Sequence, residues 1–367
     1  MKFKIGKRSR IVLIVLALLL VIILAYWISI AFKPEAYQAD FRILNTPPTS
    51  VYKAMGDKIL YYQDGVIYCL SDTGATRWSY DVGENAGFYA SDTHVLIWRG
   101  SSVFLLDANG NSTYSDNLGQ DIVFGRVSKQ YFGVVMGNER KSRLVISDLK
   151  GTQIDEESDA FANALILDFG FFGGSGEYMW TLKLDTDSTA ANTVINTFEV
   201  GKMNTGEVSL GNYITYAVLY DNNNLDVINT RRMWIYDFRL SKQVKDPVLV
   251  YGWELLDSQM HSGEDGYKLF VQAGQRSDSA NINELRMISG GKDMRYTLPT
   301  AVSAAFVSGK NLYAISSNTI YKASINDTTF VSYPLNTPNG ISGYVCKLNN
   351  GKVLLTDGID VYVLRLP

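Results

Sequence analysis

Hydrophobic and polar residues alternate along most of the chain in short runs that predict β-strands. The clearest unit is Lys58–Val82, with the sequence KILYYQDGVIYCLSDTGATRWSYDV. One strand passes through Gln63-Asp64-Gly65 into a second strand, and Asp72-Thr73-Gly74 then leads to a third strand at Trp78. Alternation indicates half-buried strands, and an Asp-Gly pair indicates a tight hairpin turn. Beyond Pro48 the pattern predicts no amphipathic helix of useful length.

The second strand of this hairpin recurs eight times along the chain. The copies are VIYCL from Val66, VFLLD from Val103, LVISD from Leu144, NTFEV from Asn196, MWIYD from Met233, ELRMI from Glu284, TIYKA from Thr319 and VYVLR from Val361. Their starts lie 35 to 52 residues apart, about 42 on average, which is typical of a four-stranded propeller blade. A further strand precedes each hairpin except the fifth, where Val208–Asn212 is a poor candidate. The sequence therefore predicts an all-β propeller of eight blades, or of seven if the fourth and fifth units merge.

The two ends of the propeller are predicted to meet in one blade. The last unit has strands at Ser342, Val353 and Val361 but no outer strand, and Phe41–Leu44 stands alone ahead of the first unit. A ring of blades must be closed so that its terminal sheets are not left with open faces. We expect Phe41–Leu44 to become the outer strand of the last blade, which would place any N-terminal anchor on the outer rim.

The first forty residues have a different composition from the rest. Residues 1–10 form a basic tail, residues 11–32 contain no charged side chain, and residues 33–40 form a linker. At ~1.5 Å per residue, residues 11–32 are long enough to cross a hydrocarbon core of ~30 Å. The basic tail predicts a cytoplasmic N-terminus and an extracytoplasmic propeller over residues 41–367. A cleaved signal peptide is the alternative, but its apolar segment is usually only ~7–15 residues long.

The predicted exterior part is acidic. Residues 34–367 carry 28 basic and 37 acidic groups, a net charge of −9, which gives no electrostatic reason to bind nucleic acid. The chain has two cysteines, Cys69 and Cys346. A disulfide is allowed outside the cytoplasm, but both residues lie in apolar strand runs, which favours two buried thiols.

The first unit resembles the PQQ-like propeller repeat. The similarity lies in DGVIYCLSDTGATRW, with a turn ending in Gly, an aromatic and apolar strand, a turn ending in Thr-Gly, and Trp. With its predicted anchor, the chain resembles the uncharacterised membrane-anchored PQQ-like propeller proteins of bacteria, and is more distantly similar to the propeller lipoprotein of outer-membrane assembly. The resemblance implies a non-enzymatic scaffold at the bacterial cell membrane. The quinone-using dehydrogenases of this repeat type carry an adjacent Cys-Cys pair, which this chain lacks.

The candidate catalytic and metal-binding patterns are weak. His94 and His261 are the only histidines, and neither has a local partner at ligand spacing. Gly173–Gly176 lacks the Lys-Ser/Thr sequel of a phosphate loop and is predicted to be a turn in the fourth blade. Asp221–Asp226 is rich in oxygen ligands but lacks the Gly and Glu of a calcium hand. We therefore predict no catalytic, cofactor-binding or metal-binding residues, and expect the strand tryptophans to pack between blades, with sugar stacking as the alternative.

Turn length distinguishes the middle blades from the others. The turns joining the second and third strands are predicted to be tight in blades one, two, seven and eight, and long in blades three to six, at 137–142, 185–193, 221–230 and 275–283. Antiparallel alternation places these turns on one face, where function is often concentrated. The predicted partner-binding residues are Asp185, Asp187, Asn192, Asp221, Asn223, Asp226, Arg276, Asp278 and Asn281. On this view, shortening the 221–230 turn should leave the fold intact.

The sequence thus favours a non-enzymatic binding or scaffolding protein of the bacterial cell envelope. We expect it to dock an envelope protein, or less directly a glycan, on one face of the propeller, without a cofactor. The alternative function is a glycan- or small-ligand-binding sensor that uses the central funnel, lined by Trp, Tyr, Asn and Asp.

Overall fold

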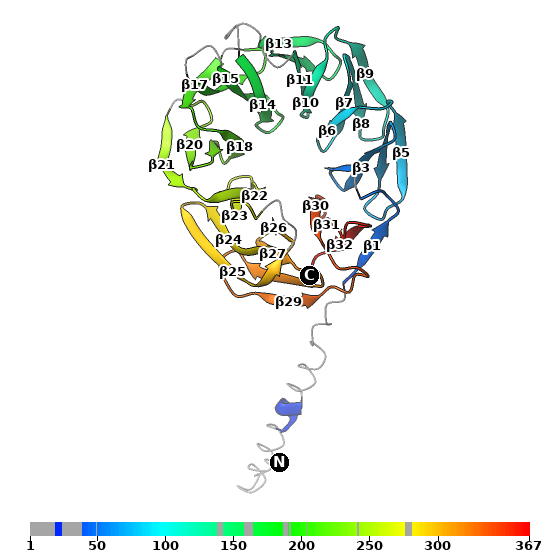
Figure 1. Cartoon of the computed structure of the whole chain (residues 1–367), viewed down its shortest axis with the longest axis vertical. Helices are drawn as coiled ribbons and strands as arrows, with labels where there is room; N and C mark the ends of the chain where they lie inside the picture. Colours follow the sequence, from blue (N-terminus) through cyan, green and yellow to red (C-terminus); the bar gives the residue numbers. More distant parts are fainter. Residues whose placement is uncertain are drawn as a thin grey trace, which may run out of the picture. The chain divides into compact units, whose positions relative to one another are not determined.

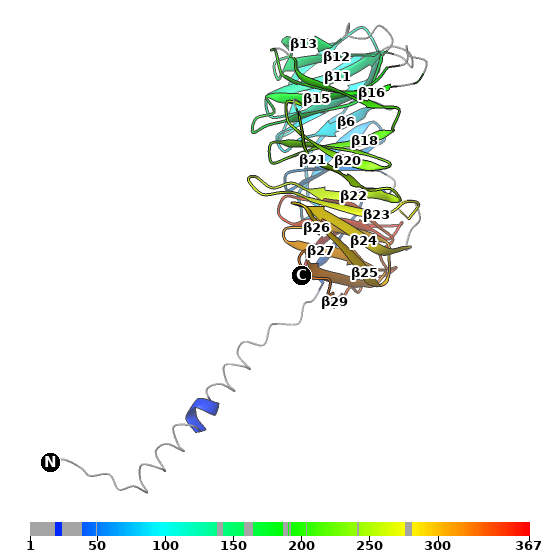
Figure 2. The same ribbon diagram turned by 90° about the vertical axis from the view of Figure 1, so that its left-hand side faces the viewer.

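The propeller from Ala39 to Pro367 is a ring of eight four-stranded antiparallel sheets. A computed structural model describes residues 19–23, 39–48, 50–137, 142–157, 164–185, 190, 192–202, 204–240, 242–275 and 281–367. Figure 1 shows the blades around the ring, and Figure 2 shows the same blades edge-on. The eight-bladed alternative is therefore correct, and the seven-bladed one is wrong.

The first four blades follow the chain, each running from its inner to its outer strand. The first contains β2 (Val51–Met55), β3 (Lys58–Gln63), β4 (Val66–Leu70) and β5 (Thr76–Asp81). The second contains β6 (Gly87–Ala90), β7 (His94–Arg99), β8 (Ser102–Asp107) and β9 (Ser112–Asn117). The third contains β10 (Ile122–Val127), β11 (Tyr131–Gly137), β12 (Ser142–Asp148) and β13 (Gln153–Glu157). The fourth contains β14 (Ala164–Phe172), β15 (Tyr178–Asp185), β16 (Asn192–Glu199) and β17 (Asn204–Gly211).

The next three blades have the same order. The fifth contains β18 (Thr215–Asp221), β19 (Asn224–Asn229), β20 (Arg232–Asp237) and β21 (Gln243–Leu249). The sixth contains β22 (Trp253–Gln259), β23 (Tyr267–Gln272), β24 (Ile282–Ser289) and β25 (Lys292–Val302). The seventh contains β26 (Ala304–Ser308), β27 (Asn311–Ile315), β28 (Thr319–Ser324) and β29 (Val331–Pro334).

The eighth blade joins the two ends of the domain, as the sequence predicts. It contains β30 (Gly343–Lys347), β31 (Lys352–Thr356) and β32 (Val361–Arg365), with β1 (Phe41–Leu44) as its outer strand. β1 pairs with β32 in antiparallel register from Phe41 opposite Leu364 to Leu44 opposite Val361. Leu44 and Val361 also belong to one buried cluster with Tyr52 and Ile59 of the first blade, so closure fixes the ring on both sides of the joint.

The fifth blade differs from its predicted form. Its first strand is β18, whereas Val208 belongs to β17, the outer strand of the fourth blade. β18 turns into β19 through Asn222 and Asn223, whose φ angles are 48° and 65°. Two successive positive φ angles are typical of a tight type I′ hairpin turn, which Asn tolerates. The polar run beginning at Asp221 is therefore a hairpin turn followed by a strand, and the prediction of one long turn at 221–230 is wrong.

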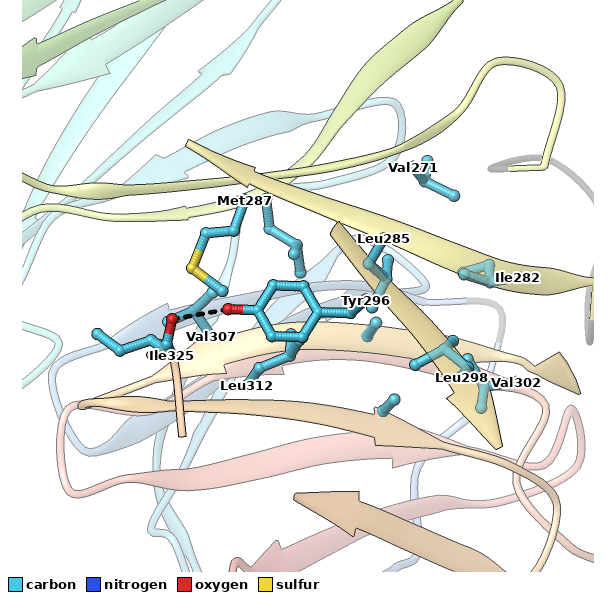
Figure 3. Close-up of a cluster of buried hydrophobic side chains, with 13 residues drawn as sticks. Val271, Ile282, Leu285, Met287, Tyr296, Leu298, Val302, Val307, Leu312 and Ile325 are labelled. Atoms are coloured by element: carbon cyan, nitrogen blue, oxygen red, sulfur yellow. Dashed lines mark hydrogen bonds between the residues drawn. The ribbon is translucent and has the colours of Figure 1, made fainter. Parts of the chain in front are cut away.

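Buried apolar residues lie between neighbouring blades. Figure 3 shows one such cluster, in which Leu285, Tyr296 and Leu298 of the sixth blade pack against Val307 and Leu312 of the seventh. The Tyr296 hydroxyl donates a hydrogen bond to the Ile325 carbonyl over 2.7 Å, which satisfies its buried polar group. Each sheet thus buries both faces against its neighbours, which an isolated blade cannot do.

Aromatic residues of the outer strands explain the glycines of the repeat. Trp78 of β5 covers Gly110 in the second blade, and Tyr114 of β9 covers Gly151 in the third. A Cβ atom would lie 2.6 Å from the Trp78 ring at Gly110, and 2.0 Å from the Tyr114 ring at Gly151. Both glycines also have φ angles above 80°, so side chains are excluded by space and by backbone conformation.

The predicted membrane span lies largely outside the described residues. Of residues 11–32, the structure describes Leu19–Ile23, and these are helical. No helix among the described residues is long and apolar enough to cross a membrane. The anchor therefore stays a prediction.

Candidate functional site

The antiparallel strands give the propeller two faces that carry different connections. One face carries the turns between second and third strands together with the connections from blade to blade, and we call it the connector face. The other carries the remaining hairpin turns, and we call it the hairpin face. On the connector face, 138–141, 186–191 and 273–281 connect strands in the third, fourth and sixth blades, as predicted, whereas the fifth blade has only Thr230 and Arg231. The predicted run of four long turns is thus interrupted.

Some of the predicted partner-binding residues lie on the connector face. Asp185 and Asn192 face each other in register at the ends of β15 and β16, and Asn281 is exposed immediately before β24. Asp187, Arg276 and Asp278 lie outside the described residues. A docking role for this set stays a prediction.

Three other predicted residues lie elsewhere. Asn223 is exposed in the β18–β19 turn on the hairpin face, while Asp221 ends β18 and Asp226 lies within β19. Both aspartates are buried, with relative exposures of 5% and 1%. A docking residue must reach its partner, so placing Asp221 and Asp226 on an exposed loop was wrong.

These two aspartates form a buried ionic cluster with Lys268 of the sixth blade, which we call the blade 5–6 triad. The Lys268 ammonium contacts Asp226 over 2.5 Å and also contacts Asp221. The second oxygen of Asp221 accepts a 2.8 Å hydrogen bond from the Gly266 amide. Burial raises the pKa of Asp226, against the attraction of Lys268. Burial alone favours the neutral amine of Lys268, but the two carboxylates outweigh it and raise its pKa.

The opposite end of the fifth blade carries an exposed cleft of about 380 Å³, which we call the blade-5 cleft. Its lining is aromatic, aliphatic and cationic, and consists of Tyr213, Arg231, Arg232, Trp234, Leu249 and Tyr251. Leu249 and Tyr251 are 63% and 71% exposed. Large apolar side chains gathered on a surface mark interaction sites more often than scattered ones do.

The first wall of the cleft is the tight turn between β19 and β20. The side-chain oxygen of the fully buried Asn229 accepts hydrogen bonds from the amides of Arg231 and Arg232, over 2.8 and 2.7 Å. An Asn side chain that accepts from the amides following it stabilises a turn locally. These hydrogen bonds fix the backbone that carries both exposed arginine side chains.

The second wall is the connection from β21 to β22. The Val250 amide donates a 2.8 Å hydrogen bond to the Arg231 carbonyl, so the two walls are joined. Arg286 of the sixth blade donates to the Leu249 carbonyl over 2.8 Å and is itself held by two hydrogen bonds to Asp293. Leu249 and Tyr251 are therefore exposed side chains on a backbone that is held from both sides, and the cleft is a preorganised surface.

A β-bulge lies opposite the Trp234 segment. Met233 pairs with Val248 and Ile235 with Lys245, so β21 has an extra residue at Asp246-Pro247. Proline cannot donate to a strand ladder, and bulges often re-aim a side chain beside a functional site. The Trp234 side chain lines the cleft and its ring centre lies 6.5 Å from that of Tyr213.

The arginines give the cleft positive charge. The Arg231 guanidinium lies 5.5 Å from the centre of the Tyr213 ring, a cation–π geometry. Neither Arg231 nor Arg232 forms a salt bridge with a residue in the described part of the chain, whereas Lys268, Arg286 and Lys352 all do. The positive charge of both arginines is thus available to a ligand at this site.

Sequence reasoning missed this cleft because its residues come from three separate segments. Trp234 is one of the strand tryptophans that the sequence predicts to pack between blades. The available signals were the Arg231-Arg232 pair beside Trp234 at a tight turn, and Asp246-Pro247 within an outer strand. Each is common alone, and only the ring brings them together with Tyr213 and Tyr251.

A second concavity, of about 540 Å³, lies among inner strands towards the hairpin face. β6, β10, β14 and β18 line it, and Arg126 is one of its lining residues. The Arg126 guanidinium donates to Asp168 over 2.9 Å and lies 4.7 Å from the Tyr89 ring centre. The predicted funnel residue types Tyr, Trp and Asp are present there, but Asp168 is already paired with Arg126.

The other candidate patterns have local partners. Gly173–Gly176 is the β14–β15 turn, as predicted, and it encloses the Glu177 carboxylate, which accepts a 2.9 Å hydrogen bond from the Ser175 amide. Hydrogen bonds from its own and neighbouring backbone amides lower the pKa of Glu177. His94 lies 2.9 Å from the Thr93 hydroxyl, and burial lowers its pKa.

The two cysteines and the acidic groups form no metal site in the described part of the chain. No group of three or more His, Cys, Asp or Glu residues converges among those that the structure describes. Cys69 is fully buried and Cys346 partly buried, and both are free thiols. Burial raises their pKa values to about 11 and about 12, so both are protonated near neutral pH.

Comparison with solved structures shows the same fold at low sequence identity. The chain is similar to BamB from Moraxella catarrhalis, with 10% identity and a TM-score of 0.54 over 90% of this chain and 97% of that one. Sqt1 from Saccharomyces cerevisiae has 8% identity and a TM-score of 0.58, covering 90% and 99%. The WD40 domain of SCAP from fission yeast has 7% identity and a TM-score of 0.60, covering 89% and 94%. No protein-family profile matches the chain, and no curated protein matches its sequence.

Proposed function

We propose that the protein is a non-enzymatic docking scaffold of the bacterial cell envelope, held by residues 11–32 in the cell membrane with its N-terminus in the cytoplasm. The propeller then lies outside, where it binds a partner protein on its connector face. The blade-5 cleft is the anchor point of that contact. The fold alone is shared with the propellers compared above, so the proposal depends on the surface of this chain.

The observation that carries the proposal is the composition and exposure of the cleft. Tyr, Trp and Arg are the residue types enriched at protein interfaces and at their energetic hot spots. Here Tyr213, Trp234 and Tyr251 lie beside two arginines on a hydrogen-bonded frame. A preformed surface loses little entropy on binding, which suits a docking site.

In-cell photo-crosslinking tests this proposal. A photoreactive residue replaces Tyr251 in the cleft, and in a matched variant it replaces Ile359 in the eighth blade. Both side chains are strongly exposed, at 71% and 65%, and both lie in turns of the connector face. We expect a specific crosslinked partner from position 251 and none from position 359. The proposal is wrong if position 251 gives no specific product, or if both positions capture the same proteins equally.

The inner-strand concavity supports a second candidate function, a sensor for a glycan or small polar ligand. Tyr89 and Tyr220 line it with Arg126, and aromatic and hydrogen-bonding groups together suit such ligands. Soluble glycans added to the purified full chain should then raise its melting temperature, and Arg126→Ala should abolish the rise. No rise with any glycan tested would leave the docking function as the sole candidate.

A further inference from the structure

We infer that the blade-5 cleft recognises an acidic peptide segment that carries one large apolar side chain. This inference rests on the proposed docking function and names the chemistry of the partner. It follows from three properties of the cleft, namely its unpaired charge, the presentation of that charge, and its apolar lining.

The charge of the cleft runs against the charge of the domain. Residues 34–367 have a net charge of −9, and several cations of the described part are paired with carboxylates, as in Lys352 with Asp72 and Arg286 with Asp293. At Arg231 and Arg232 no described carboxylate is within salt-bridge distance, and both side chains are exposed. A local cationic site on an acidic domain is complementary to a ligand with carboxylates.

The geometry of Arg231 favours carboxylate binding. Its guanidinium carbon lies over the Tyr213 ring, and a guanidinium group that contacts a ring in this way can still use its N–H donors for bidentate hydrogen bonds to a carboxylate. Arg232 is the next residue, and Asn229 holds both backbone amides. Two guanidinium groups on one fixed turn suit two acidic residues close together in a segment.

The remaining lining selects an apolar side chain. Trp234, Leu249 and Tyr251 contribute apolar surface to a cleft of about 380 Å³. This volume is in the range of small-molecule sites, so the cleft can accept one side chain but not a whole domain. An aromatic or large aliphatic side chain of the peptide would pack against Leu249 and Tyr251, whose side chains are otherwise exposed. Acidic residues beside this side chain would then reach the arginines.

An anionic membrane surface is the other ligand that arginines and aromatics suit, and the structure disfavours it. The lining residues form a concave surface, which a single side chain fits better than a flat bilayer does. The net charge of −9 also repels the propeller from a negatively charged surface. A peptide contacts only the cleft and avoids most of this repulsion.

Fluorescence anisotropy with the purified full chain in detergent tests the inference. The probe is a short labelled peptide with a central Phe flanked by Asp and Glu; the comparison peptides replace Phe by Ala, or the acidic residues by Lys. We expect the acidic Phe peptide to bind at least about tenfold more tightly than either comparison peptide, the ratio produced by one good contact of ~1.4 kcal/mol. Arg231→Gln with Arg232→Gln should remove that preference, whereas Lys292→Gln, at the exposed first residue of β25, should retain it.

Each outcome supports or overturns the inference. Equal binding of the acidic and lysine peptides overturns it, and so does binding that survives the double arginine variant. Binding of the full chain to anionic lipid vesicles that requires Arg231 and Arg232, with no peptide binding, assigns the cleft to a membrane instead. If the peptide preference is absent while position 251 still crosslinks a protein, the docking function stands and only the partner chemistry is wrong.

Discussion

The two ends of the fifth blade contain charged residues in opposite situations. At the hairpin face, Asp221, Asp226 and Lys268 are buried and bind one another across the boundary with the sixth blade. At the connector face, Arg231 and Arg232 are exposed, with no carboxylate partner among the described residues. The paired charges hold the ring together, while the unpaired charges are open to a ligand. The contrast predicts that substitutions of the charged residues alter folding at the first end and binding at the second.

The largest effect is expected from Lys268→Met, which leaves two buried carboxylates without their cation. Breaking a buried ion pair on one side costs about 3–5 kcal/mol of unfolding free energy. Lys352→Met is the matched control, because its bridge to Asp72 also joins two blades but is about one-quarter exposed. Such a pair contributes up to ~1 kcal/mol. Urea unfolding of both variants measures the two losses of unfolding free energy. Equal losses would contradict the difference expected between the buried and the partly exposed ion pair.

The loss in Lys268→Met should also depend on pH. Burial holds the folded-state pKa of Asp226 above its ordinary value, even with Lys268 present, and removing the cation raises it further. An acid whose pKa is raised in the folded state destabilises the fold at pH values above that pKa. The lost stability returns as the pH falls towards the pKa of the unfolded state, about 3.9. The stability gap between Lys268→Met and the wild type should therefore narrow from pH 7 towards pH 4. A gap that is constant or widens would contradict burial of the carboxylates.

An intermediate effect is expected from Asn229→Ala, which removes the hydrogen-bond acceptor beneath the cleft. The unfolding free energy should fall by about 1–3 kcal/mol, since a buried side chain loses its bonds to two amides. Peptide binding should fall as well, because the turn carrying both arginines is released. Asn350→Ala is the control, since Asn350 is exposed and accepts from the Lys352 amide in the eighth blade. Unchanged peptide binding in Asn229→Ala would show that the turn presents the two arginines without the hydrogen bonds to Asn229.

The smallest effect on stability is expected from Tyr251→Ala, because the side chain is mostly exposed. Such surface changes usually stay within about 0.5 kcal/mol. Crosslinking from a neighbouring position, Leu249, should nevertheless fall clearly. A loss of stability similar to that of Asn229→Ala would mean that Tyr251 belongs to the core rather than to the docking surface.

The sequence predicted the ring more completely than the site, for a physical reason. The strands from Val66 to Val361, and closure by Phe41–Leu44, depend on alternation and turn chemistry, which are local. The β18–β19 hairpin was missed because Asp226 looks solvent-exposed until Lys268, 42 residues later, is placed beside it. The cleft forms because Tyr213, Trp234 and Tyr251, which lie in three separate segments, come together in the folded ring. No local sequence pattern indicates that these segments are neighbours.

The most direct test of the account is photo-crosslinking from position 251 in the wild type and in the variant with Arg231→Gln and Arg232→Gln, with urea unfolding of both. The account predicts that the double variant keeps the wild-type unfolding free energy within about 0.5 kcal/mol, as surface changes do, and loses the crosslinked partner. An undiminished crosslink in the folded double variant would contradict the claim that the unpaired end of the fifth blade is the docking site.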